Sequence, residues 1–75
     1  MNEEIFQLVS EIIDVPISKM NLNTGPENEP QWDSLAQFTI VSATEDKYKI
    51  KLTMQEIVSI KNLSDLINII NSKTK

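Results

Sequence analysis

The sequence predicts an all-α protein: a small four-helix bundle with three main helices, a short third helix and a long loop between helices 1 and 2. Apolar residues recur at helical spacing in separate segments, and helix start and stop signals lie between these segments. The 75 residues include one glycine, too few for a sheet with many tight turns. This length suits a single domain, residues 1–75, with one modest core.

The first helix is expected over residues 3–14, because the apolar residues of that segment fall on one face. They follow the spacing of a buried helical stripe: Ile5, Leu8, Val9, Ile12 and Ile13. Pro16 disfavours helical geometry at the residue before it, so the helix is expected to end nearby.

Residues 15–32 form the expected long loop, which three prolines and the single glycine interrupt. Its apolar residues, which we expect to pack against the core, are Ile17, Met20 and Leu22. Loops of this length are unusual in so small a domain, and they tend to carry function or to be disordered.

The second helix is expected over residues 34–47. Asp33 is a favourable N-cap, which places Ser34 in the first helical turn. The apolar positions of this helix cover a wider surface than one core stripe requires: Leu35, Phe38, Ile40, Val41 and Ala43.

Two further helices are expected after residue 52. Thr53 and Glu56 have the spacing of a capping box, which predicts a short helix over residues 53–59. Asn62 is the expected cap of a last helix over residues 63–73, which has apolar residues at helical spacing. Residues 48–52 alternate as in a strand, but this strand has no partner, so we expect none there.

The sequence contains no His and no Cys, which excludes several kinds of chemistry. The usual general base near neutral pH, a thiolate nucleophile, disulfides and the spacing of a metal site are all missing. The chain is therefore expected not to be an enzyme. No apolar segment is long enough to span a membrane, and the acidic first residues do not resemble a targeting peptide, so cytoplasmic location is expected.

The net charge of −4 is unevenly distributed. Residues 1–46 contain nine acids and one lysine, whereas residues 47–75 contain two acids and six lysines. The acidic portion disfavours nucleic acid and favours basic protein partners. The alternative is that both portions are merely solvated faces.

The segment Trp32-Asp33-Ser34-Leu35 resembles the acyl carrier family, whose signature is Asp-Ser-Leu at the start of the second helix after a long loop. Residues 56–66 are also similar to the family's third-to-fourth helix segment, and the resemblance covers nearly the whole chain. It implies that Ser34 accepts a 4'-phosphopantetheine arm from coenzyme A. Acyl groups would then travel on the arm as thioesters. Asp33 would contact the transferase's metal-bound coenzyme, and Leu35 is expected to belong with Ser34 and Asp33 to the cofactor-binding segment.

The resemblance also implies partners and a docking surface. The expected partners are a phosphopantetheinyl transferase and the enzymes that load and use the acyl group. The carrier itself is expected to be a monomer. The expected partner-binding residues are Leu35, Val41, Glu45 and Asp46. We expect Phe38 in the core, whereas Val41 is left open between the core and a lining for the acyl chain.

The chain departs from the family pattern close to Ser34. Ala36, Gln37 and Thr39 stand where acids are usual, which favours a specialised carrier over the general fatty-acid carrier. An aminoacyl or peptidyl carrier, and a helical interaction module that is never modified, stay open as alternatives. Trp32 is expected to pack over the loop rather than to touch substrate. A hydrophobic staple is not expected, because its partner position is the polar Gln37.

Overall fold

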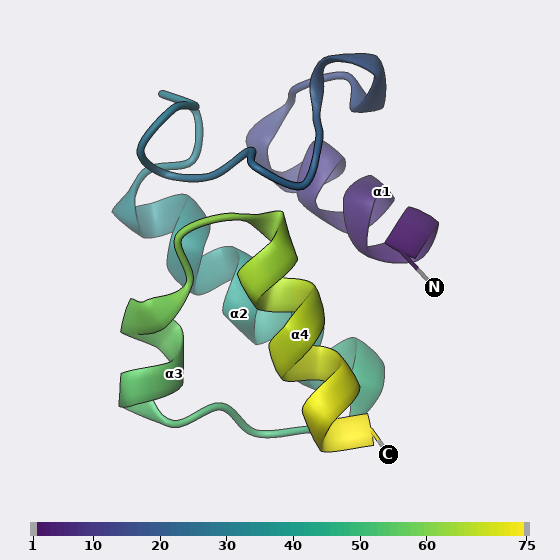
Figure 1. The fold of residues 1–75 in the computed structure, drawn as a ribbon, viewed down its shortest axis with the longest axis vertical. Helices are drawn as coiled ribbons and strands as arrows, with labels where there is room; N and C mark the ends of the chain where they lie inside the picture. The colour runs from purple at the N-terminus through teal and green to yellow at the C-terminus, as the bar shows by residue number, and fades with distance from the viewer. Residues whose placement is uncertain (1, 75) are drawn as a thin grey trace.

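The computed structural model describes residues 2–74 and confirms the all-α class (Figure 1). Its elements are α1 (Asn2–Ile13), the 3-10 helix η1 (Ile17–Lys19), α2 (Ser34–Tyr48), α3 (Met54–Ser59) and α4 (Leu63–Thr74). Each α-helix boundary lies within one residue of its expected place, and residues 2–74 contain no strand. In the same range, no helix has both the length and the apolar character needed to cross a membrane.

The hydrophobic core lies between the three longer helices. Its residues with at most 1% exposure come from all three helices and the end of the loop: Ile5, Val9, Trp32, Ile40, Leu63, Leu66 and Ile70. The short α3 contributes no fully buried residue. It lies on one side of α4, and α1 lies on the other (Figure 1). The sequence therefore predicted both the three main helices and the short third helix.

The long loop passes close to the start of α4 (Figure 1) and is bonded to the first turn of this helix. The amide of Leu63 donates to the carbonyl of Thr24 at 2.9 Å, and the amide of Ser64 donates to Leu22 at 3.0 Å. These bonds satisfy amides that have no partner within the helix. At Gly25 the loop approaches closely: a Cβ there would collide with the carbonyl oxygen of Lys61. The glycine is therefore needed for close contact.

The apolar residues of the loop follow the expectation only in part. Met20 is buried as expected, but Ile17 and Leu22 are 45% and 47% exposed, so the expectation of core packing was wrong for these two. The backbone of Leu22, not its side chain, attaches the loop to α4. Because the backbone bonds already anchor the loop, the side chain of Leu22 can remain at the surface.

Candidate functional site

Ser34 is the first residue of α2, and its side chain is exposed. Asp33 precedes it in extended geometry and caps the helix: its carboxylate accepts from the amide of Ala36 at 2.9 Å. The carbonyl of Asp33 accepts from the amide of Gln37. The sequence-based N-cap at Asp33 and the place of Ser34 are thus confirmed.

The start of α2 can hold an anion beside the Ser34 hydroxyl. The amides of Ser34 and Leu35 come too early in the helix to donate within it. Within residues 2–74 these two amides also donate no other hydrogen bond. Together with the dipole of a 15-residue helix, they favour negative charge at this point. The donor set fits a phosphodiester attached to Ser34.

An open groove of about 530 Å³ runs beside Ser34, between α2 and α3. Apolar side chains make most of its walls, including Phe38 of α2 with Met54 and Val58 of α3. Glu27, Asp33 and Lys61 also line it and bring two negative charges and one positive charge. Its volume lies within the range of about 300–1,000 Å³ that is usual for small-molecule sites.

Three of these apolar side chains are unusually exposed for their size. Phe38 is 56% exposed, Met54 64% and Val58 63%, and Leu35 nearby on α2 reaches 76%. Clustered exposed apolar residues commonly mark a binding surface. We call Leu35, Phe38, Met54 and Val58 the apolar rim. The exposure of Leu35 agrees with its expected position on the surface.

The expectation that Phe38 lies in the core was wrong. At 3.6 residues per turn, Phe38 points about 160° away from Ile40, which is 1% exposed. The core side of α2 is formed by Ala36, Ile40, Val41 and Thr44. The wide apolar surface of this helix is therefore divided between two sides, one facing the core and one facing solvent.

Val41 and Glu45, which were expected to contact partners, both make contacts within the chain. Val41 is 4% exposed and belongs to the core, so in this conformation it offers almost no surface to a partner. The carboxylate of Glu45 accepts from the amide of Leu52 at 2.8 Å, which holds the connection between α2 and α3. Asp46 is exposed on the same side of α2 as Leu35 and is the better placed of the two acids.

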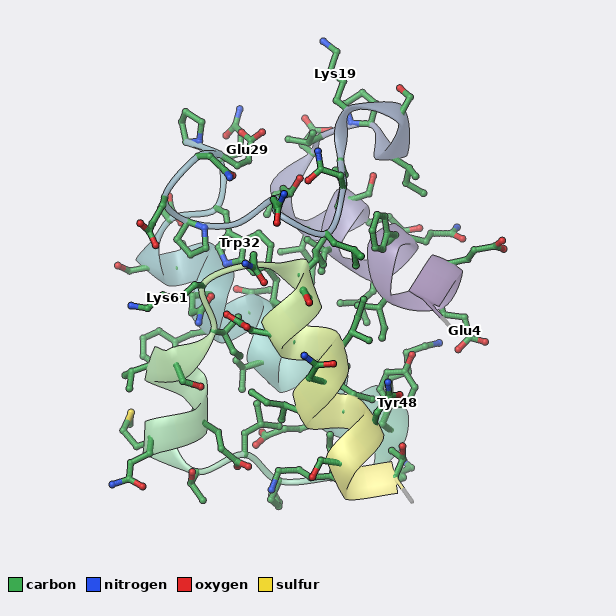
Figure 2. All side chains as sticks on the ribbon, in the orientation of Figure 1. Glu4, Lys19, Glu29, Trp32, Tyr48 and Lys61 are labelled. Carbon is green, nitrogen blue, oxygen red and sulfur yellow. The ribbon has the colours of Figure 1, made fainter. Side chains whose placement is uncertain are left out.

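Trp32 was expected to pack over the loop; it is 1% exposed and belongs to the core. Figure 2 shows it between the long loop and the helices. Its indole Nε1 donates to Oε1 of Gln37 at 2.6 Å, and Nε2 of Gln37 donates to the carbonyl of Ile57 at 2.8 Å. We call this chain the Gln37 bridge. A hydrogen bond thus joins the two positions of an apolar staple, a possibility that the sequence analysis missed.

Polar contacts define the start of α3 and attach the helix to α4. The capping box is present: Thr53 Oγ1 accepts from the amide of Glu56, and Glu56 accepts from the amide of Thr53. Glu56 also pairs with Lys73 of α4 at 3.0 Å. The bond from Thr53, followed by the contact with Lys73, lowers the pKa of Glu56 below its ordinary value.

The fold is similar to that of solved acyl carrier proteins. The chain is similar to a candidate acyl carrier protein from Mycobacterium tuberculosis, with a TM-score of 0.85, 20% identity and 95% of each chain covered. It is also similar to the holo acyl carrier protein of Geobacter metallireducens, with a TM-score of 0.83 and 24% identity, covering 96% of this chain and 83% of that one. No family model and no curated protein matches the sequence. The chain has the acyl carrier fold.

Proposed function

We propose that this chain is an acyl carrier protein whose 4'-phosphopantetheine arm is attached to Ser34. The observation that carries the proposal is the position of Ser34: an exposed hydroxyl at the start of a capped 15-residue helix, beside an open apolar groove. Similarity in fold to two acyl carrier proteins supports the same role. The chain would serve as a carrier rather than as a catalyst, in the cytoplasm and as a monomer.

Attachment of the arm requires little from this chain beyond an accessible nucleophile. The Oγ of Ser34 forms a bond to the phosphorus of coenzyme A that bears the pantetheine. The pyrophosphate P–O bond breaks, adenosine bisphosphate leaves, and the hydroxyl proton passes to a base of the transferase. The free amides of Ser34 and Leu35 then favour the phosphodiester anion at the helix start. When bound, the arm supplies a thiol, which the sequence lacks.

The apolar rim is the proposed docking surface for the transferase and for the loading and using enzymes. Its four side chains flank Ser34 on both α2 and α3, so a partner that covers them also covers the hydroxyl. Apolar anchors near the centre of an interface commonly contribute most of the binding energy. Asp46, farther along the same side of α2, would add long-range attraction to a basic partner.

The test is modification in vitro. The chain is incubated with coenzyme A, magnesium and a broad-specificity transferase, and the product is mapped by mass spectrometry. We expect one arm, on the peptide that contains Ser34. Ser34→Ala should fold normally and accept none, because this first-turn substitution has little helix-propensity cost. Ser42→Ala, at an exposed serine of the same helix, is the matched control and should be modified like the native chain.

The same experiment separates the alternatives. A chain that several transferases leave unmodified is a helical interaction module, and the carrier proposal fails. A modified chain that partner enzymes load with amino acids instead of acyl groups is an aminoacyl or peptidyl carrier. Intact mass of the chain purified from its native source distinguishes these cargoes directly.

A further inference from the structure

The amide of Gln37 accepts one hydrogen bond and donates another, and its orientation is unambiguous. An indole N–H can only donate and a backbone carbonyl can only accept. The oxygen of Gln37 must therefore face Trp32, and its nitrogen must face Ile57, as the two bonds of 2.6 Å and 2.8 Å require. Turning the amide over would break both bonds at once. The Gln37 bridge thus holds one arrangement of the loop end, α2 and α3.

The bridge lies where the groove meets the core. Trp32, Gln37 and Ile57 all line the groove, together with Ile60. Behind them lie Ile40, Leu63 and Leu66, each at most 1% exposed, and none of these three lines the groove in the described part of the chain. The groove is therefore closed on its inner side.

The closure of the groove depends on the position of α3, the helix on its far side. None of the six residues of α3 is fully buried, and Ile57 is the α3 residue that packs against the core, partly buried. The bond from Gln37 to Ile57 attaches α3 to α2, and the Glu56–Lys73 pair attaches it to α4. Moving α3 outward to open a path into the core would break the first bond and leave the amide of Gln37 without its acceptor.

We propose that the Gln37 bridge excludes cargo from the core, so that the arm and its acyl group stay in the open groove. This inference rests on the proposed carrier function and specifies its substrate class. The groove has mostly apolar walls with two acids and one lysine, and its inner side is closed. It suits short acyl groups, including polar ones, that need no burial in the core. Gln37 is the residue that sets this limit.

The native chain provides the first test. Butyryl, octanoyl and dodecanoyl arms are attached to Ser34 from the corresponding acyl coenzyme A, and the methyl signals of Ile40, Leu63 and Leu66 are followed by NMR. We expect these core signals to keep their positions for all three cargoes. The thermal midpoint should also stay at that of the arm alone. Core signals that shift progressively with chain length would show that the cargo enters the core, and the inference would be wrong.

Gln37→Met provides the second test, because methionine has a similar length and helix propensity but cannot make either bond. In this variant we expect the dodecanoyl arm, but not the butyryl arm, to shift the core methyl signals and raise the thermal midpoint. Gln55→Met, at an exposed glutamine of α3, is the matched control and should behave like the native chain. A variant that excludes the dodecanoyl group as fully as the native chain would remove Gln37 from this role.

A measurement without the arm tests the bridge itself. Hydrogen exchange at the indole N–H of Trp32 should be at least tenfold faster in Gln37→Met than in the native chain and in Gln55→Met. Equal rates would contradict the bridge. A chain that accepts no arm at Ser34 overturns the proposed function and this inference with it. A chain that accepts the arm and then buries a long cargo overturns this inference alone.

Discussion

Leu35 allows docking to be separated from stability, because it is the most exposed large apolar residue named in the apolar rim, at 76%. About a quarter of its surface is buried. Full burial of a leucine contributes about 1.5–3 kcal/mol, so a quarter corresponds to about 0.4–0.8 kcal/mol. Alanine has a slightly higher helix propensity, which offsets a few tenths of this loss. Leu35→Ala should therefore lower the free energy of unfolding by less than about 1 kcal/mol.

The same substitution at Leu63, which is 0% exposed, should cost about 2–5 kcal/mol. Urea unfolding of the two variants measures both values. The rate of arm transfer at low carrier concentration then measures docking. If Leu35 anchors the transferase, its loss should cost more than about 1 kcal/mol of binding, which is a fivefold or greater fall in kcat/KM. Leu22→Ala, at a half-exposed leucine outside the groove, controls for the loss of any surface leucine.

Two results would refute this reasoning. A loss of stability at Leu35 within the range of a buried leucine would mean that the side chain packs in the core and that the exposed side of α2 is misassigned. Unchanged transfer by a stably folded Leu35→Ala chain would mean that the transferase docks elsewhere, and the long loop with Glu27 and Glu29 becomes the better candidate.

Further expectations concern the loop, the acids and pH. Gly25→Ala should destabilise the fold by about 1–3 kcal/mol in thermal unfolding, because its Cβ would collide with the carbonyl of Lys61; a change below about 0.5 kcal/mol would contradict this close approach. Asp46→Lys should slow arm transfer modestly at low salt and hardly at physiological salt, because Asp46 lies about 18 Å along the helix from Ser34, beyond the screening length of ~8 Å. Only Asp46 is reversed, because reversing Glu45 would also break the hydrogen bond between Glu45 and the amide of Leu52. If the transfer rate falls steeply with salt, and equally in the native chain and in Asp46→Lys, docking must depend on other acids. Because the pKa of Glu56 is lowered in the folded chain, the ionised carboxylate stabilises the fold at pH values above its ordinary pKa of 4.5, and this stability is lost as the pH falls below that value. Glu56→Gln should therefore weaken the fall of the urea midpoint with decreasing pH. If the midpoints of the native chain and the variant fall in parallel, the expectation is wrong.

Local signals in the sequence determined the helices and the position of Ser34. Pro16, the Asp33 cap and the Thr53–Glu56 capping box act within a few residues of themselves, so their effect can be read without knowing the fold. Apolar spacing identified the core sides of the first and last helices, because each has a single stripe. The candidate modification site follows from these same local features.

Only the tertiary structure decided which side of α2 faces the core. Its apolar residues extend around much of the helix, and spacing alone cannot show which of them a neighbouring helix will cover. Phe38 was therefore misplaced, and Val41, which the sequence left open between the core and a lining for the acyl chain, is buried. The groove beside Ser34 likewise needs α3 in position, and Met54 and Val58 carry no local sign that they will line it.

The Gln37 bridge depends still more on the fold. Gln37 and Ile57 are 20 positions apart, and their bond forms only when α3 has returned to the side of α2. In the sequence, a glutamine in a first helical turn is equally consistent with a solvated residue. Burial of Trp32 makes its polar neighbour necessary, because an indole N–H removed from water needs an acceptor. That requirement arises from packing between distant segments, which residue spacing does not encode.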